Sequence, residues 1–220
     1  MNDFILSCTS PVDLKKEILE SRNISYMCFK YQLGDTVYPD DFGESMPYEQ
    51  MYQKMVEGAD TKTSQIGVGE YLDYFCEKLK SGKDVLHITL SSGVSGDYNS
   101  ATSAALIARE RYPERKLYIV DSLGASSGYG LLVDKAADLR DEGMDIDGLN
   151  DWLTENRLNV HLWFYSSDLT FYVRGGRVSK AAGIFGGILN ICPVLNVDYL
   201  GRLTARTKVR GKKKAISELL

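Results

Sequence analysis

One segment of this 220-residue chain constrains the fold more than any other. The apolar run 85–90 leads directly into a Ser- and Gly-rich turn over 91–96, and an Ala-rich helical pattern follows over 98–111. A continuous apolar run favours a strand buried on both faces, which is typical of a parallel sheet covered by helices. Hydroxyl groups in the turn and free N–H groups of the next helix favour an anion site.

Strand and helix patterns alternate through the first two thirds of the chain. This alternation predicts an α/β fold, in which a mostly parallel sheet is flanked by helices. Ligands of such sheets lie at the carboxyl ends of the strands, so the turns 91–96 and 121–128 are the clearest candidate loops. The expected strands are 4–7, 25–31, 36–38, 85–90 and 116–120; the expected helices are 11–22, 48–57, 69–81, 98–111 and 128–142, with a polar loop over 61–67.

The character of the chain changes near residue 145. We expect an N-terminal α/β domain with the ligand loops over 1–145 and a second, smaller α/β domain over 146–220. Because the chain stops soon after a helix start at 212, the second domain is expected to be incomplete. In that region we expect helices over 146–157 and 180–191, a strand over 160–165, and a hairpin formed by 193–197 and 203–209.

The net charge of −4 conceals an uneven distribution. Residues 174–220 have a net charge of +8 and the remainder has −12, which predicts a basic face at the C-terminal end. A partner or a phosphate-bearing ligand could use this face, or it could be solvated surface. Nucleic acid is not an expected partner, because the basic stretch lacks interleaved aromatic residues and the whole chain is acidic.

Other features exclude several classes of protein. No apolar stretch approaches the roughly 20 residues that span a bilayer, and the N-terminus lacks the basic region of a signal peptide. The four cysteines form no CxxC pair, so we expect reduced thiols, a cytoplasmic location and no metal site.

A catalytic set is not evident. The segment 93–97 resembles the Gly-x-Ser-x-Gly elbow of serine hydrolases, but its second glycine falls one place early. His87 lies in a predicted central strand and His161 in an apolar run, so both are interpreted as structural residues. No phosphate-binding loop or dinucleotide fingerprint is present, and Gly128-Tyr129-Gly130 indicates close helix packing instead. We therefore predict no catalytic residue and no cofactor.

A group of loop hydroxyls remains. Each alone is explained by helix capping, whereas convergence of two such loops on an anion is the sharper hypothesis. The group comprises Thr61, Thr63, Ser64, Ser91, Ser92, Ser95, Ser126 and Ser127.

The order of these motifs resembles the DegV family over essentially the whole chain. The resemblance is specific because the motifs occur together. They are Thr63-Ser64-Gln65, the stretch 90–101, Val120-Asp121-Ser122, Arg174-Gly175-Gly176-Arg177 and the basic stretch 208–215.

The resemblance implies a two-domain protein that binds a long-chain fatty acid, such as palmitate, between its domains. In several bacteria such proteins present the acid to a separate ATP-binding kinase, which makes the acyl-phosphate. By the resemblance, Thr63 and Ser95 hold the carboxylate, while Arg174 and Arg177 serve kinase docking or domain packing. The chain itself is then a carrier and not an enzyme.

The chain departs from the family pattern at several points. The largest departure is the absence of a later His-containing Gly-Pro-Gly segment that helps to close the head-group site. Two other classes therefore stay open: a small-molecule enzyme (a serine hydrolase or a sugar-kinase-like subunit), and a regulatory or structural variant that binds no ligand. At four further positions this chain differs from the residue usual in the family: it has Cys8 in place of Asp, Ile66 in place of Pro, Asp97 in place of Thr and Cys192 in place of Lys.

Overall fold

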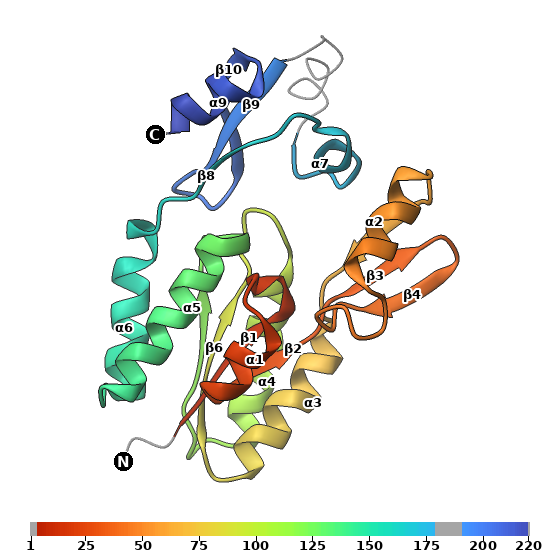
Figure 1. The fold of residues 1–220 in the computed structure, drawn as a ribbon. Helices are drawn as coiled ribbons and strands as arrows, with labels where there is room; N and C mark the ends of the chain where they lie inside the picture. The colour runs from red at the N-terminus through yellow and green to blue at the C-terminus, as the bar shows by residue number, and fades with distance from the viewer. Residues whose placement is uncertain (1–3, 179–190, 220) are drawn as a thin grey trace.

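A four-stranded parallel sheet, sheet A, forms the centre of the computed structural model, which describes residues 4–178 and 191–219 (Figure 1). Its strand order is β2-β1-β6-β7, and every neighbouring pair is parallel. The predicted mostly parallel sheet flanked by helices is therefore confirmed. The strands are β1 (Phe4–Thr9), β2 (Ile24–Met27), β6 (Asp84–Thr89) and β7 (Leu117–Asp121).

Helices cover both faces of sheet A. Side chains alternate between the faces, so Leu86 and Ile88 of β6 pack with α5 and α6, whereas Val85 packs with α3 and α4. A side chain at Gly130 would collide with the Val12 carbonyl, so this glycine allows the close packing that its motif predicted. The helices are α1 (Lys16–Ser21), α3 (Val68–Lys80), α4 (Asp97–Arg111), α5 (Ser126–Asp141) and α6 (Ile146–Asn156).

Helix α6 belongs to the core of sheet A. Its side chains Ile146, Leu149 and Leu153 are buried in the same cluster as β1 and α5. The expected domain boundary at residue 145 stays a prediction, but by packing the first unit extends through α6. A short 3-10 turn, η2 (Arg157–Asn159), then leads to the second unit.

A small antiparallel sheet, sheet B, projects from the edge of sheet A with helix α2 (Tyr48–Val56) beside it (Figure 1). The predicted strand 36–38 is present as β4, but the sequence did not predict a separate sheet here. The expected strand 25–31 divides into β2 and β3, and the expected polar loop 61–67 contains a strand, because exposed Thr- and Lys-rich residues carry no apolar alternation. The order is β4-β3-β5, with β3 (Lys30–Leu33), β4 (Thr36–Pro39) and β5 (Thr61–Ser64).

The expected helix over 11–22 is also wrong in part. Asp13 adopts a left-handed φ of 51°, which separates the 3-10 turn η1 (Ser10–Val12) from α1. The chain thus leaves the carboxyl end of β1 as a short loop rather than as a continuous helix.

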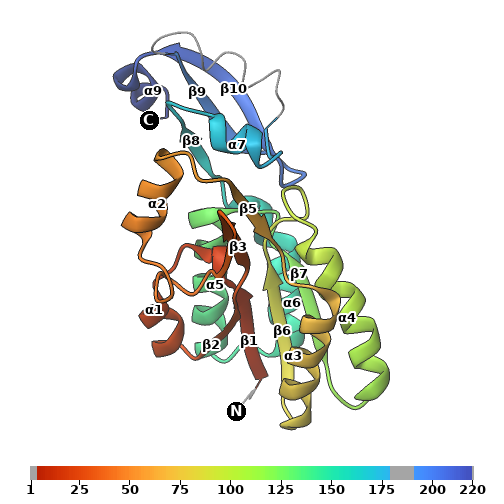
Figure 2. The same ribbon diagram turned by 90° about the vertical axis from the view of Figure 1, so that its right-hand side faces the viewer.

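A second unit lies beyond the carboxyl ends of the sheet A strands (Figure 2). It contains antiparallel sheet C, order β10-β9-β8, and the predicted hairpin is confirmed. The helix expected over 180–191 lies outside the described residues except for Ile191, which begins β9. The elements are β8 (Trp163–Tyr165), α7 (Thr170–Arg174), β9 (Ile191–Val197), β10 (Leu203–Arg210) and α9 (Lys212–Leu219).

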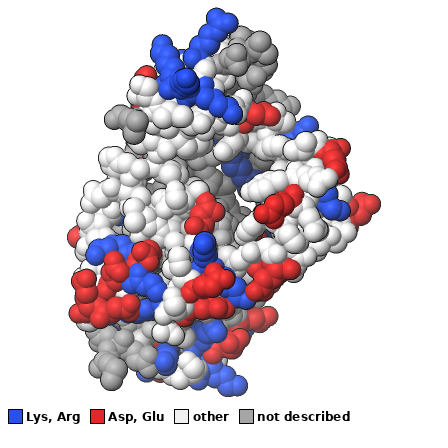
Figure 3. All heavy atoms as spheres, in the orientation of Figure 1, with Lys and Arg blue, Asp and Glu red and all other residues white. Residues whose placement is uncertain are grey.

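The surface of the second unit is basic on the face shown in Figure 3, where Lys and Arg gather over β10 and α9. Lys212, Lys213 and Lys214 are exposed on α9, and Arg210 is exposed at the end of β10. Within residues 4–178 and 191–219, no helix combines the length and the apolar character that crossing a bilayer requires.

Candidate functional site

The Ser/Gly turn follows β6 at the carboxyl edge of sheet A, and Ser91 holds it in place. The buried Ser91 hydroxyl donates to the Gly201 carbonyl at 2.8 Å, and its Oγ accepts the Gly93 N–H at 3.0 Å. The Ser92 N–H donates to the Asp121 carboxylate at 3.1 Å. Ser91 is therefore committed to the structure of the turn and to its contact with sheet C.

Two glycines allow the backbones to approach closely here. A Cβ atom on Gly93 would lie 2.5 Å from the Gly201 carbonyl carbon, so only glycine fits without displacement. Gly201 itself has a φ of +71°, in the region that favours glycine. The β9–β10 turn thus rests directly on the Ser/Gly turn.

Asp198 organises that β9–β10 turn. Its carboxylate accepts the Leu200 N–H at 2.9 Å and the Arg202 N–H at 3.0 Å, and the Arg202 guanidinium at 3.0 Å. Burial alone raises the pKa of Asp198, but these hydrogen bonds outweigh it and lower the pKa to about 2. The turn that contacts the site is thereby held by charge-assisted hydrogen bonds.

Gln65 connects the two loops that the sequence predicted to converge. The partly buried Ser95 hydroxyl donates to Gln65 Oε1 at 3.3 Å, and Gln65 Nε2 donates to Ser100 at 2.9 Å. Thr63 lies two residues before Gln65 on β5, where it is exposed and pairs in register with Tyr31. The structure therefore places the two loops side by side, while a carboxylate held by Thr63 and Ser95 stays a prediction.

A cavity of about 440 Å³ opens beside Thr63. Its size lies within the roughly 300–1,000 Å³ range of small-molecule pockets. Arg177 lines it and donates from Nε to the Val94 carbonyl at 3.2 Å, which ties the segment after α7 to the Ser/Gly turn. Apolar and aromatic side chains form much of the wall: Tyr31, Met51, Tyr52, Met55 and Phe171. Two exposed arginines, Arg174 and Arg177, lie beside them.

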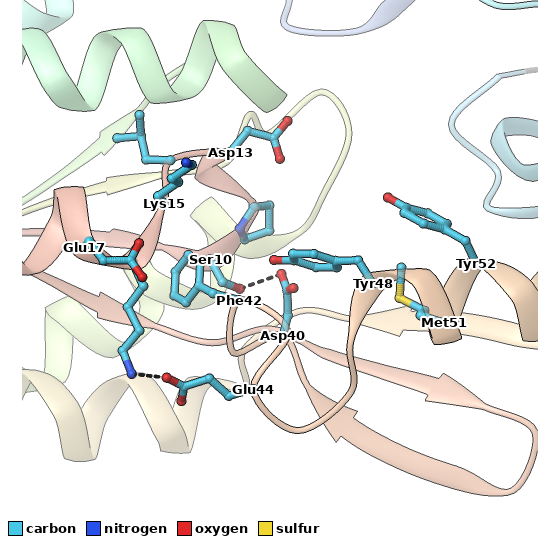
Figure 4. Close-up of a pocket in the computed structure, with 13 residues that line it drawn as sticks. Ser10, Asp13, Lys15, Glu17, Asp40, Phe42, Glu44, Tyr48, Met51 and Tyr52 are labelled. Atoms are coloured by element: carbon cyan, nitrogen blue, oxygen red, sulfur yellow. Dashed lines mark hydrogen bonds and ion pairs between the residues drawn. The ribbon is translucent and has the colours of Figure 1, made fainter.

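A second cavity, of about 570 Å³, lies between the loop after β1 and α2 (Figure 4). It shares Met51 and Tyr52 with the first cavity. Four of its polar side chains form two pairs: Lys16 with Glu44 at 2.5 Å, and Ser10 with Asp40 at 2.8 Å.

Asp40 is partly buried at this cavity, which the sequence did not predict. Burial raises the pKa of Asp40, against the hydrogen bond from Ser10 that lowers it. A carboxylate beside a turn carries no local signal of burial, because the segment that covers it lies elsewhere in the chain.

His87 is a core residue, as predicted. Its Nδ1 lies 2.8 Å from Ser7 Oγ and its Nε2 lies 3.3 Å from Tyr71 Oη. Burial lowers its pKa to about 3, so the ring is neutral. The enclosed Ser7–His87 pair has no access to solvent, since both residues have zero exposure.

The interpretation of His161 as a packed structural residue is wrong. His161 is exposed and lies just before β8. The apolar run around it resembles a buried strand, but only its last three residues pair in sheet C. Within residues 4–178 and 191–219, no cluster of three or more His, Cys, Asp or Glu side chains is arranged to hold a metal ion.

A protein-family comparison identifies the chain. The model described as "Uncharacterised protein, DegV family" matches residues 8–220. The chain belongs to the DegV family. A DegV domain-containing protein of Clostridium perfringens is 33% identical over 219 residues, which is 100% of this chain and 75% of that protein. A DegV domain-containing protein of Lactococcus lactis is 34% identical over 99% of this chain and 75% of its own length.

Solved DegV structures share the fold. A DegV family protein from Thermus thermophilus, described by its fatty acid binding, has a TM-score of 0.83 and 31% identity over 98% of this chain and 74% of its own. The Streptococcus pneumoniae Fatty Acid Kinase (Fak) B3 protein, loaded with linoleic acid, has a TM-score of 0.85 and 27% identity over 98% of this chain and 76% of its own. Both are similar to this DegV chain in sheet A and in the unit that carries sheet C.

Proposed function

We propose that this DegV family member binds a long-chain fatty acid, with the carboxylate held by Thr63 and Ser95. The observation that carries the proposal is the junction of the two hydroxyl loops at Gln65, beside a cavity with an apolar wall. Ser95 donates to Gln65 in the structure, so an incoming carboxylate would replace Gln65 Oε1 as the acceptor. A carboxylate is the stronger acceptor of the two.

The energetics suit a carrier. Burial of an acyl chain contributes about 0.8 kcal/mol per CH₂, so a 16-carbon tail supplies on the order of 10 kcal/mol before ordering costs. Hydrogen bonds to the charged head group add about 1.5–3 kcal/mol. The tail therefore sets most of the affinity, and the two hydroxyls set the preference for an acid over an ester.

We also propose that the loaded chain meets a separate ATP-binding kinase in the cytoplasm, which forms the acyl-phosphate. Two kinds of support favour this step. Arg174 and Arg177 are exposed at the cavity beside Thr63, where they can face both the partner and a phosphorylated head group. The similarity to the Fak B3 protein points to the same class of partner.

The alternative classes have weaker support. A hydrolase would need a base at Ser95, whereas Ser95 contacts Gln65 and Asp97, and His87 contacts Ser7 and Tyr71. A variant that binds no ligand is less well supported, because the cavity of about 440 Å³ beside Thr63 has the size of a small-molecule pocket. That the chain is a carrier with no catalytic activity of its own stays a prediction.

The test compares palmitate with its methyl ester. In the double variant Thr63→Ala/Ser95→Ala, we expect affinity for palmitate to fall about 10- to 100-fold, because charge-assisted hydrogen bonds are lost. Affinity for the methyl ester should change little. Fluorescence displacement measures both, and native mass spectrometry of the purified wild-type chain checks for a co-purified acid.

The matched control is Ser64→Ala/Ser92→Ala, which removes hydroxyls from the same two loops. Ser64 faces the Lys30 carbonyl at 3.5 Å and Ser92 is exposed. This control should keep the wild-type preference for the acid. Equal discrimination by both double variants would reject the assigned head-group site.

A further inference from the structure

The carboxyl group of Asp97 lies buried directly behind the proposed head-group site. Asp97 is the first residue of α4 and has zero exposure. Its Oδ1 accepts the Tyr71 hydroxyl at 2.7 Å. Its Oδ2 has no hydrogen-bond partner in the part of the chain that the structure describes. An ionised carboxylate in this position is under-satisfied, which is costly in a buried environment.

The groups that face Asp97 do not neutralise its charge. They are Tyr71 from α3, Tyr129 from α5 and, behind Tyr71, His87 from β6. Burial raises the pKa of Tyr71 and of Tyr129, and it lowers the pKa of His87 to about 3, so all three are neutral near pH 7. The charge of Asp97 is therefore poorly screened toward the loop beside it.

A direct backbone contact links Asp97 to the ligand loop. The Asp97 N–H donates to Ser95 Oγ at 3.2 Å, and Ser95 is the hydroxyl proposed to hold the fatty-acid carboxylate. The carboxylate of a ligand bound to Ser95 would then lie near Asp97, with the ligand on the loop and the Asp97 side chain in the core behind it. Two carboxylates this near to each other repel unless one of them binds a proton.

We propose that Asp97 makes fatty-acid binding proton-linked: the site takes up a proton when the ligand carboxylate arrives, and it binds the acid more tightly when Asp97 is protonated. This inference rests on the proposed function and adds the determinant of its pH dependence. Asp97 is a positioning and charge-setting residue here, since its side chain points into the core and not at the ligand.

The titration of Asp97 falls in the range where such linkage is measurable. Burial raises its pKa to about 6, although the hydrogen bond from Tyr71 and, to a smaller extent, the nearby Leu90 amide and Thr9 hydroxyl act in the opposite direction. At pH 7 the free chain is mostly ionised at Asp97, and near pH 5.5 it is mostly protonated. An anion at Ser95 should raise this pKa further, so proton uptake should accompany binding at pH 7.

The test measures proton uptake directly. Palmitate, kept below its micelle concentration, is titrated calorimetrically into the full chain at pH 7 in phosphate and in Tris, two buffers with different ionisation enthalpies. The variants are Asp97→Asn and, as a second choice should Asn disturb folding, Asp97→Thr. The matched control is Asp151→Asn, an exposed acid on α6 whose side chain accepts a hydrogen bond from the neighbouring Asn150.

We expect the wild type and Asp151→Asn to take up about half a proton to one proton more than either Asp97 variant. Between pH 5.5 and 7.5, the palmitate affinity of the wild type and of Asp151→Asn should fall about tenfold more than that of the Asp97 variants. The comparison with the Asp97 variants also removes the contribution of the titration of palmitate itself. In the wild type alone, ¹³C NMR of the aspartate carboxyls should show a higher Asp97 pKa with palmitate bound.

The outcomes separate the two proposals. If palmitate binds and the Asp97 variants match the wild type in proton uptake and pH profile, the inference is overturned and the fatty-acid function stands. An Asp97 pKa that ligand binding leaves unchanged overturns it equally. If no variant and no wild-type chain binds palmitate, both proposals fail.

Discussion

The two units of the molecule are held together in different ways. Sheet A buries two apolar clusters, one on each face, with large residues such as Phe75 and Leu86 fully enclosed. Sheet C has smaller clusters, around Val194 and around Leu195, and meets sheet A through a polar turn at Asp198 and Gly201. The Ser/Gly turn lies at this junction, so the extensively packed sheet A unit supplies this loop and the less extensively packed sheet C unit rests against it.

The largest expected effect comes from a change in the apolar core of sheet A. Phe75→Ala should lower the free energy of unfolding by about 3–5 kcal/mol, because it leaves a cavity in a fully buried cluster. Amide hydrogen exchange should then accelerate in both sheets, because the β9–β10 turn of sheet C rests on the Ser/Gly turn that follows β6. Val194→Ala is the matched change in sheet C and should accelerate exchange there alone. Similar exchange patterns for the two variants would contradict the contrast between the units.

An intermediate effect tests the junction. Gly93→Ala places a Cβ 2.5 Å from the Gly201 backbone, so the β9–β10 turn must move, at a cost of about 1–3 kcal/mol. Exchange should increase in sheet C and the affinity for palmitate should decrease, while sheet A keeps its protection. Gly69→Ala on α3 is the control, because nothing lies within 4 Å of a Cβ there. The proposed coupling is wrong if Gly93→Ala and Gly69→Ala behave alike.

The smallest expected effect per step of the measurement, about 1.4 kcal/mol for each pH unit, is a pH dependence that arises from two buried groups of sheet A and its helices. The pKa of His87 is about 3, below its ordinary value, so the unfolded chain binds that proton first and stability falls as pH drops below about 6.5. The pKa of Asp97 is about 6, above its ordinary value, so the folded chain holds its proton longer and stability rises as pH drops from 6 to 4. The two slopes oppose each other.

In Asp97→Asn, the loss of stability that His87 causes at low pH should therefore no longer be offset by Asp97. Between pH 6 and 4 the variant should lose about 1.4 kcal/mol more per pH unit than the wild type, as measured by urea unfolding. Asp198 in the sheet C turn has a pKa of about 2, below its ordinary value, so its contribution to stability is lost as pH falls below about 4, and this loss is the same in both proteins. Parallel pH profiles of the two proteins would show that Asp97 does not carry a raised pKa.

Local sequence signals were sufficient for sheet A and for the β9–β10 hairpin. Their strands carry apolar runs or alternation that is read over a few residues, and turns rich in Gly, Ser or Asp bound them. The same reasoning failed for β5, whose residues are polar on both sides, and for His161, which lies exposed just before the strand that its apolar neighbours form.

Parts of the candidate site were beyond any local signal. The Ser/Gly turn and Thr63 were found from the sequence, but the role of Gln65 as the link between them was not. Local patterning alone did not distinguish Ser91 from Ser95, although the DegV resemblance singled out Ser95. The physical reason that Ser91 is occupied elsewhere is its contact with Gly201, 110 positions away, which only the folded structure shows.

By itself, the sequence determined that a buried strand ends in a Ser/Gly turn and opens a helix, because hydrophobic patterning and turn chemistry act over a few neighbouring residues. Only the tertiary structure decided that Asp97 is buried with one unpartnered oxygen, that Gly93 meets Gly201, and that the loops of Thr63 and Ser95 adjoin. Burial and contact depend on segments that are distant in the chain, and the folded packing alone brings them together.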